Sequence, residues 1–504
     1  MSNIMKTAII SIVFMLCLAC NTQHKSNNNE LFSISNDSIE TIKKDSNQLN
    51  RVSKIDEFIT KANEYKILNG VIQVVEKNEV IYSKAIGLAN MEWSVPHTMD
   101  SKFKLASVSK QFTCMLILQL VDEGKINLDG KITDYLPDYP AEQGSKVSIR
   151  NLMSHTSGIP NFSNFENWYT ELSVKEYSNK EFLELFKNLD LEFEPGSRFN
   201  YSNSGYRILA TIIEKIYEKS YETVMYEKIF KPLNMTNSGC FDINTIVPQM
   251  ASPYEYWDFQ FTRSDYHSPT TVLGAGSVYS TMDDMWKWHK ALISSTLISK
   301  SLTNEMMSMQ INVRNNYGYG FGFFVGNVNI NTNTYEYIGH TGAYPGFHSL
   351  YAWFPQSERF ILVMNNTGHT RLNFIRDEIM KILEGGDYHI LPELSVLMSD
   401  AVSKAELEEL VSRYKISPGE FECNEEQINR LGYKLILEHN TETGLLVLEF
   451  NSETFPKSSS AHQQLGWAYS ELGQFEKAKK ELKRSLELDP ENEKAEAILI
   501  KIMN

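Results

Sequence analysis

The sequence predicts an α+β fold, with an antiparallel sheet packed against helices, followed by a small all-α region. Three observations support this prediction. β-rich runs occur at two distant places, residues 70–85 and 319–364. A helix-rich block of residues 130–310 lies between them, and a Glu/Lys/Leu-rich helical region begins near residue 390. A sheet begun by early strands and completed by late ones should therefore carry the helical block as a second lobe.

The first fifty residues are expected to export and tether the protein. Lys6 precedes an apolar run, residues 7–19, that is too short to span a bilayer and reads as a secretory signal. Cys20 directly follows, as in bacterial lipoprotein signals, so residues 1–20 are predicted to be a signal peptide and Cys20 the lipidated residue. Cys17 stands where such signals usually have leucine, and simple secretion or an uncleaved anchor remain alternatives. Residues 21–50 are rich in Asn, Ser and Lys and are predicted to be a flexible tether.

The main domain is predicted over residues 51–390. A helical pattern from Val52 to Ala62 precedes two β-rich runs, 70–75 and 80–85, which flank a Glu-Lys-Asn-Glu hairpin signal. An apolar helix follows over 112–121 and ends at Gly124. Further strands are predicted at 319–325, 335–339, 348–354 and 360–364, and a helix over 372–383 closes the domain.

Residues 391–504 are predicted to be a helical linker and two repeats. Leu431-Gly432 recurs as Leu465-Gly466, an offset of 34 residues, which is the tetratricopeptide period. Two repeats are fewer than a free-standing solenoid needs. The helix 405–414 and the tail from Glu493 are therefore expected to pack alongside as caps. Structural support and docking of a protein partner are both open roles for the repeats.

Composition and motifs exclude several classes of function. The formal charge of −15 leaves no basic stripe for phosphates, so we expect no nucleic acid partner. Cys114, Cys240 and Cys423, the cysteines beyond the signal, give neither a disulfide framework nor a zinc pattern. We expect no metal and no cofactor. Cys114, Trp286 and Trp288 are interpreted as packing residues.

Ser107 and Lys110 are the candidate nucleophile and its activator. A helix starting near Ser107 places both on one face, and a partly desolvated lysine can take the proton of a serine hydroxyl. Ser101 and Lys104 have the same spacing, but no apolar helix follows directly from them. The context therefore favours Ser107.

A second motif supplies a phenol and a carboxamide. Tyr201 and Asn203 stand two residues apart in a glycine-bounded loop, where Tyr201 could pass the proton as a phenolate favoured by a nearby ammonium. Asn203 could hydrogen-bond the substrate. Tyr177 and Asn179 repeat the tripeptide in a charged stretch without glycine, and we reject them for that context.

A third motif lies at a strand end. Residues 339–343 read Gly-His-Thr-Gly-Ala, and such glycines let a ligand approach the backbone closely. The backbone N–H groups of Ser107 and Ala343 are the expected oxyanion donors. His340 would bring a group that titrates near neutrality to the cleft. His155 is interpreted as part of a structural turn, and residues 274–276 as either a tight loop or a cleft wall.

These three motifs, in this order, resemble those of the penicillin-recognising serine hydrolases, which include class C β-lactamases, D-alanyl-D-alanine carboxypeptidases and related esterases. Residues 152–158, 232–235 and 274–281 also match, and the resemblance covers about residues 55–385. It implies a β-lactamase/transpeptidase-like fold with a site between two lobes and an acyl-serine intermediate. Ser107 would be the nucleophile, Lys110 and Tyr201 the base pair, and Asn203 a substrate contact. His340, Thr341 and Gly342 would form the binding strand.

The sequence thus predicts an exported, membrane-anchored serine hydrolase of D-alanyl peptides, β-lactams or small esters, facing the periplasm or the cell exterior. Typical β-lactamases have lysine where this chain has His340, which favours a peptidase or esterase. No G-x-S-x-G elbow supports an α/β-hydrolase. The alternative is a lapsed enzyme that senses cell-wall fragments and recruits a partner through its repeats.

Overall fold

The computed structural model describes residues 36–368, 370–401 and 403–503. The predicted signal, Cys20 and the first part of the predicted tether lie outside these residues. Helix α1 (Asn36–Glu64) begins within the segment predicted as a tether. Its second half carries the predicted apolar pattern, because Ile55, Phe58 and Ile59 are fully buried. In the described part of the chain, no helix combines the length and apolar character needed to cross a membrane.

The main domain is built around an eight-stranded sheet in which all neighbours are antiparallel. The strand order is β10-β11-β12-β13-β14-β15-β1-β2, so the early hairpin joins the late strands through β1 and β15. The strands are β1 (Gly70–Glu76), β2 (Glu79–Ile86), β10 (Ile311–Arg314), β11 (Tyr317–Tyr319), β12 (Phe324–Ile330), β13 (Asn333–Tyr344), β14 (Phe347–Phe354) and β15 (Arg359–Asn365).

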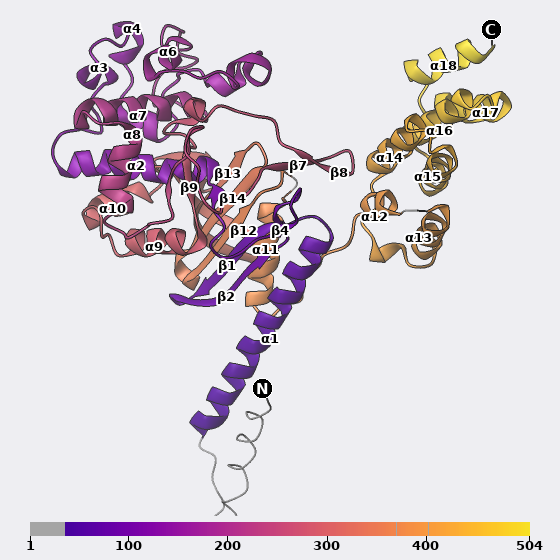
Figure 1. The fold of residues 1–504 in the computed structure, drawn as a ribbon, viewed down its shortest axis with the longest axis horizontal. Coiled ribbons are helices and arrows are strands. Elements are labelled where there is room, and N and C mark those ends of the chain that lie inside the picture. The colour runs from indigo at the N-terminus through magenta and orange to yellow at the C-terminus, as the bar shows by residue number, and fades with distance from the viewer. Residues whose placement is uncertain (1–35, 369, 402, 504) are drawn as a thin grey trace, which may run out of the picture. The chain divides into compact units, whose positions relative to one another are not determined.

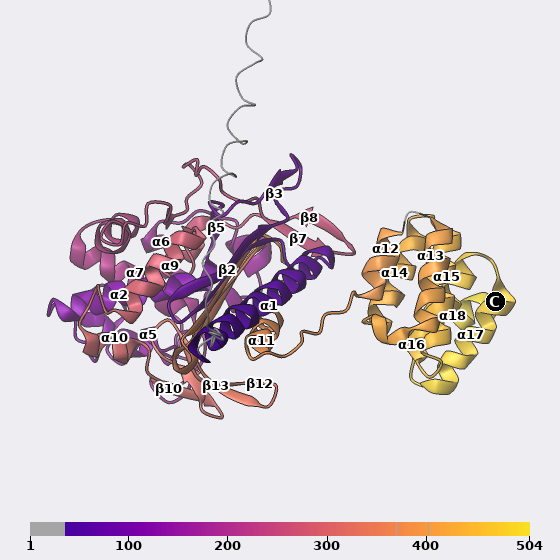
Figure 2. The same cartoon turned by 90° about the horizontal axis from the view of Figure 1, so that it is seen from below.

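Helices cover both faces of this sheet, as Figures 1 and 2 show. On one face, α1 and α11 (Leu372–Leu383) pack on alternate strand residues such as Ile361 and Val363. On the other, Phe360 and Leu362 join the core of the helical lobe. Because side chains alternate along a strand, burial on both faces explains the unbroken apolar run of β15. The predicted α+β architecture is confirmed.

One predicted strand is wrong. Residues 319–325 do not form a single strand, because the chain reverses between Tyr319, the end of β11, and Phe324, the start of β12. Gly320 and Gly322 lie in this reversal, and Gly322 has a φ of +80° that favours glycine. The apolar pattern marked the two strand ends, but not the turn between them.

The helical lobe contains the predicted apolar helix as α2 (Lys110–Asp122), preceded by the 3-10 turn η1 (Ala106–Ser109). Cys114 is fully buried in α2, and Trp288 stacks on Phe112 with ring centroids 4.2 Å apart, as expected of packing residues. The other helices of the lobe are α3 (Ile132–Tyr135), α4 (Ala141–Gly144), α5 (Ile149–Met153), α6 (Asn179–Glu184), α7 (Asn203–Tyr217), α8 (Tyr221–Met225), α9 (Met282–Ile293) and α10 (Lys300–Met306).

Short turns and strands complete the domain. The turns are η2 (Phe162–Asn164), η3 (Trp168–Leu172), η4 (Tyr226–Phe230), η5 (Pro269–Val272) and η6 (Pro355–Ser357). The short strands pair as β3 (Leu88–Asn90) with β4 (Val95–Pro96), β7 (Tyr254–Trp257) with β8 (Gln260–Arg263), and β9 (Val278–Ser280) with both β5 (Phe103–Lys104) and β6 (Gly239–Cys240).

The C-terminal region is all helical, as predicted. Its elements are α12 (Leu394–Asp400), α13 (Lys404–Ile416), η7 (Pro418–Glu420), α14 (Glu425–Leu437), α15 (Thr441–Thr454), α16 (Ser459–Glu471), α17 (Phe475–Leu488) and α18 (Glu493–Met503). The two predicted repeats are the pairs α14–α15 and α16–α17. A Cβ on Gly432 would lie 2.5 Å from Leu448, and one on Gly466 would lie 2.7 Å from Leu482. In both helix pairs the glycine of the first helix therefore packs closely against a leucine of the second helix, and the two contacts are 34 residues apart in the sequence.

Candidate active site

Ser107 and Lys110 lie side by side where η1 passes into α2. Lys110 Nζ is 3.1 Å from Ser107 Oγ, and it donates at 2.8 Å both to Asn203 Oδ1 and to the carbonyl oxygen of Ala275. Burial of the fully enclosed amine lowers the pKa of Lys110 well below its usual value. The structure therefore places a serine hydroxyl beside an amine whose burial favours the neutral form.

The backbone before Ser107 is held in an unusual conformation. Ala106 has a φ of +50°, which is rare for a residue with a Cβ. Glycines of two other segments pack against this turn. A Cβ on Gly342 would lie 2.2 Å from the carbonyl oxygen of Leu105, and one on Gly276 would lie 3.5 Å from Ala106. Segments distant in sequence thus pack closely on the strained turn, as is common at functional sites.

Tyr201 reaches the same pair from the segment before α7. Lys110 Nζ lies 4.9 Å from the centre of the Tyr201 ring. Burial raises the pKa of Tyr201, while the nearby Ser107 hydroxyl opposes the rise. Among the described residues, no hydrogen bond of normal geometry satisfies the Tyr201 hydroxyl. The raised pKa contradicts the predicted phenolate, because burial favours the protonated phenol.

Asn203, the first residue of α7, is oriented by three hydrogen bonds. Its Oδ1 accepts from Lys110, its Nδ2 donates to Ser163 Oγ at 3.2 Å, and its backbone N–H donates to Asn161 Oδ1 at 3.1 Å. An amide nitrogen carries two hydrogens, so one N–H of Asn203 remains for a ligand.

His155 hydrogen-bonds the backbone on both sides of Tyr201, although the sequence suggested only a structural turn. Its carbonyl oxygen accepts from Asn200 N at 2.8 Å, and its Nδ1 accepts from Ser202 N at 3.1 Å. Its ring centroid lies 4.1 Å from that of Tyr201. Burial holds the pKa of His155 well below its usual value, so the ring is neutral and carries its proton on Nε2. His155 thereby fixes the backbone on both sides of the phenol.

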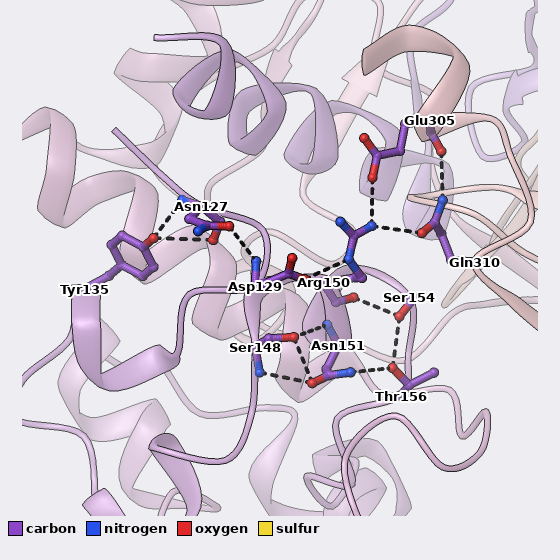
Figure 3. Close-up of polar contacts among 10 residues, drawn as sticks. All are labelled: Asn127, Asp129, Tyr135, Ser148, Arg150, Asn151, Ser154, Thr156, Glu305 and Gln310. Carbon is purple, nitrogen blue, oxygen red and sulfur yellow. Dashed lines mark hydrogen bonds and ion pairs between the residues drawn. The ribbon is translucent and has the colours of Figure 1, made fainter. Parts of the chain in front are cut away.

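His155 has a left-handed backbone, with a φ of +58°. Its neighbours Ser154 and Thr156 belong to the polar network drawn in Figure 3. Asn151 Nδ2 donates to Thr156 Oγ1 at 3.1 Å, and Ser154 Oγ donates to the Arg150 carbonyl at 2.8 Å. The Arg150 guanidinium in turn reaches Glu305 at 2.7 Å. The residues around His155 are thus tied to two helices, α5 and α10. No sequence signal separated this supporting role from an ordinary turn.

The binding strand is the second half of β13. Strand β12 pairs with β13 only as far as Gly339, opposite Phe324, so residues 340–344 have no β12 partner on that edge. On the other edge they pair with β14. Thr341, Gly342 and Ala343 also line a hollow of about 380 Å³ with His348 and the first residues of α11. A free strand edge beside Ser107 can pair with an extended ligand.

His340 does not titrate as predicted. Its Nδ1 lies 2.6 Å from the Thr341 carbonyl oxygen and its Nε2 lies 3.1 Å from the Tyr319 hydroxyl. Since a carbonyl only accepts, the proton sits on Nδ1 and Tyr319 donates to Nε2. Burial lowers the pKa of His340 to about 3. The expectation of a group titrating near neutrality in the cleft is therefore wrong.

The glycine-rich segment 274–276 belongs to the site wall. Besides the Ala275 contact with Lys110, the Gly274 carbonyl accepts from Thr113 Oγ1 at 2.6 Å. Gly274 also has a φ of +76°, so the segment is both a tight turn and part of the site. In the described part of the chain, no cluster of three or more potential metal ligands occurs.

Comparisons with known proteins place this geometry in a family. A beta-lactamase family profile matches residues 55–383, and a tetratricopeptide repeat profile matches residues 459–492. The chain belongs to the beta-lactamase family. Among curated relatives, Penicillin-binding protein 4* of Bacillus subtilis is 28% identical over 323 residues, covering 59% of this chain and 68% of the relative. Teichoic acid D-alanine hydrolase of Staphylococcus aureus is 26% identical over 261 residues, covering 51% and 61%.

Among solved structures, a penicillin-binding protein from Bacillus halodurans superposes with a TM-score of 0.56 at 25% identity. It covers 65% of this chain and 98% of the other. These relatives support a serine hydrolase of the β-lactamase fold, and the structural match agrees with the predicted architecture. The family profile ends at residue 383, before the C-terminal helical region begins.

Proposed function

We propose that the protein is a serine hydrolase that acylates Ser107 with a D-alanyl peptide, β-lactam or small ester and then releases the acid to water. The observation that carries this proposal is the buried Lys110 beside Ser107, since burial lowers its pKa and favours the neutral amine. A neutral amine has two N–H bonds, which the acceptor oxygens of Asn203 and Ala275 occupy. The lone pair is then left for the Ser107 hydroxyl proton.

The first half-reaction follows from these positions. As Ser107 Oγ attacks the substrate carbonyl, its proton passes to Lys110, and the N–H groups of Ser107 and Ala343 stabilise the oxyanion. The protonated Tyr201 gives its proton to the leaving group and is restored by the Lys110 ammonium. Substrate R–CO–X thus becomes acyl-serine and HX.

The second half-reaction uses the same groups in reverse. A water molecule attacks the acyl-serine while its proton passes to Lys110 by way of Tyr201, which takes up one proton as it gives up another, and the proton on Lys110 returns to Ser107 Oγ as the acid leaves. Asn203 and the edge of residues 340–342 would hold the substrate in this step. Because His340 is neutral, the site offers no ammonium there for a β-lactam carboxylate, which favours peptide or ester substrates.

We also propose that the protein is exported and anchored through a lipid on Cys20, as its signal pattern suggests. The cell-wall roles in the names of its relatives agree with this location. For the repeats we propose a protein partner. A groove of about 560 Å³ between α14, α16 and α18, lined by Tyr433, Trp467 and Lys494 among others, offers a binding surface.

The proposal is tested by steady-state hydrolysis of a panel of D-alanyl-D-alanine peptides, penicillins and short-chain esters. We expect turnover of at least one peptide or ester, faster than of any penicillin, and none by Ser107→Ala. Turnover that survives in Ser107→Ala would refute the assignment. A stable adduct on Ser107 without turnover would instead favour the lapsed sensor.

A further inference from the structure

Lys104 is a partly buried cation that the proposed mechanism does not use. It lies on β5, three residues before Ser107, and its Nζ sits over three aromatic rings. The centroids of Phe241, Tyr344 and Phe347 are 4.4, 4.7 and 5.7 Å away. Among the described residues, it has no carboxylate partner. The rings favour an ammonium, but they do not neutralise its charge.

The position of Lys104 follows from two contacts. Strand β5 pairs with β9 next to the glycine-rich wall, with Lys104 opposite Tyr279. Tyr344, one of the three rings, ends the binding strand two residues beyond Gly342, or about 7 Å at the usual rise per residue. Gly342 itself packs on the carbonyl of Leu105, the residue after Lys104. The ammonium therefore lies at the Tyr344 end of the free strand edge.

That end should receive the acyl part of a substrate. Tyr201, the proposed donor to the leaving group, lies near the opposite end, with its ring centroid 6.1 Å from that of His340. A substrate bound along the edge with its leaving group at Tyr201 extends its acyl group past Ala343 towards Tyr344. Lys104 is only partly buried, and the Tyr344 hydroxyl donates to the His267 carbonyl at 2.7 Å.

The rings of Phe241, Tyr344 and Phe347 form an aromatic cage around the Lys104 ammonium. The charge inside this cage determines which ligand would bind there. Burial lowers the pKa of Lys104 to about 8, so the amine is still mostly protonated at neutral pH. A buried charge is costly unless it is paired. A carboxylate on the ligand would supply the missing partner, whereas a second ammonium would be repelled.

We propose that Lys104 is a specificity-determining residue that binds a carboxylate on the acyl portion of the substrate and disfavours acyl groups with a free ammonium. This inference rests on the proposed function at Ser107. It narrows the substrate class to acyl donors with an acidic group, such as acidic peptides ending in D-alanine, over free D-alanyl esters or amides.

Three substrates with one leaving group test the proposal on the full chain. They are the p-nitroanilides of N-succinyl-D-alanine, of its methyl succinyl ester and of free D-alanine, which are anionic, neutral and cationic. We expect the wild type to prefer the anionic over the neutral substrate by about tenfold in kcat/KM, since hydrogen bonds between charged groups commonly have that strength. The cationic substrate should be the poorest.

Lys104→Met should reduce the anionic preference to about onefold, and Lys104→Arg should retain it. Lys102→Met is the matched control. Lys102 carries the same charge two residues earlier, where its Nζ donates to the Pro248 carbonyl, so this variant should keep the preference. In the wild type the preference should fall as pH rises through about 8, because the amine loses its proton. No preference in the wild type, or one that survives Lys104→Met, would overturn the proposal.

Binding separates this inference from the proposed function. Calorimetry with Ser107→Ala measures affinity for the anionic and neutral compounds without turnover. Tighter binding of the anionic compound, lost in Ser107→Ala/Lys104→Met, would support the role of Lys104 even if the wild type hydrolysed neither compound. Equal affinities would refute it even if Ser107 proved to be the nucleophile.

Discussion

The serine-lysine pairs Ser107–Lys110 and Ser101–Lys104 have the same spacing, but they differ completely in geometry. Ser107 and Lys110 lie on one turn, with Oγ and Nζ 3.1 Å apart. Ser101 instead accepts a hydrogen bond from Thr98 N at 3.0 Å, while Lys104 points into its aromatic cage. Residues 103–104 are a β-strand, in which positions three apart face opposite sides. Spacing brings two side chains together only when the backbone between them is helical.

The two Tyr-Ser-Asn tripeptides teach the same lesson. Both end on the first residue of a helix, Asn179 in α6 and Asn203 in α7. In the first, Ser178 caps its helix by accepting from Glu181 N, and Asn179 pairs with Arg207 and Glu214. In the second, the amide of Asn203 turns to Lys110. The same tripeptide at the start of a helix thus serves packing in one place and the site in the other.

Among the variants that test the difference between the two serine-lysine pairs, Lys110→Met should have the largest effect on the reaction rate. Loss of the proton acceptor should slow acylation of Ser107 by about a thousandfold, within the range of general base catalysis. Stopped-flow measurement of acylation by an activated ester tests this. Ser101→Ala is the matched control and should change the rate by less than about twofold, since surface or remote hydroxyls take no part in proton transfer. A similar loss in both variants would remove the distinction between the pairs.

The two tyrosines provide the next test. Tyr201→Phe should lower kcat by about a hundredfold, because the leaving group loses its proton donor. Tyr177→Phe is the control, because it removes a hydroxyl that also lacks a hydrogen-bond partner among the described residues but takes no part in the proposed proton transfer. Comparable kcat values for Tyr201→Phe and the wild type would show that another group protonates the leaving group.

His155 provides a third test of the comparison between the two tripeptides. It hydrogen-bonds the backbone on both sides of Tyr201. His155→Ala should lower kcat by about tenfold with KM little changed, because misplaced catalytic groups lose rate rather than affinity. His155→Asn tolerates the left-handed backbone and should lose less. The kcat and KM of both variants are measured with thermal unfolding as a check on the fold. A rise in KM alone would place His155 in substrate binding instead.

The smallest expected effect is that of His340 on the pH dependence of kcat/KM. With its pKa near 3, His340 stays neutral between pH 5.5 and 7.5, so His340→Gln should leave the shape of the kcat/KM profile unchanged in that window. A step near pH 6.5 that disappears in His340→Gln would show that the histidine titrates in the free enzyme.

The same depressed pKa affects stability. An unfolded histidine binds a proton near pH 6.5, whereas folded His340 binds one only near pH 3. The unfolded state therefore binds more protons between these values, and stability present above pH 6.5 is lost as pH falls. Urea unfolding should show a shallower pH dependence for His340→Gln than for the wild type.

Much of this molecule could be predicted from its sequence, and the failures have physical causes. The sheet strands 70–75, 348–354 and 360–364 were visible because alternating or continuous apolar runs reflect one or two buried faces. The reversal at Gly320–Phe323 was missed because its apolar residues resemble a strand. The protonation of Tyr201 and His340 could not be predicted, because it depends on burial by segments distant in sequence. The roles of His155 and Lys104 likewise depend on neighbours from other elements.

The most direct test of the account is the position of the acyl group. The full-length protein is treated with a slowly hydrolysed penicillin or activated ester, digested, and the modified peptide is sequenced by mass spectrometry. The account predicts one acyl group, located on Ser107, and none on Ser101. An adduct on Ser101, or labelling that persists in Ser107→Ala, would contradict it.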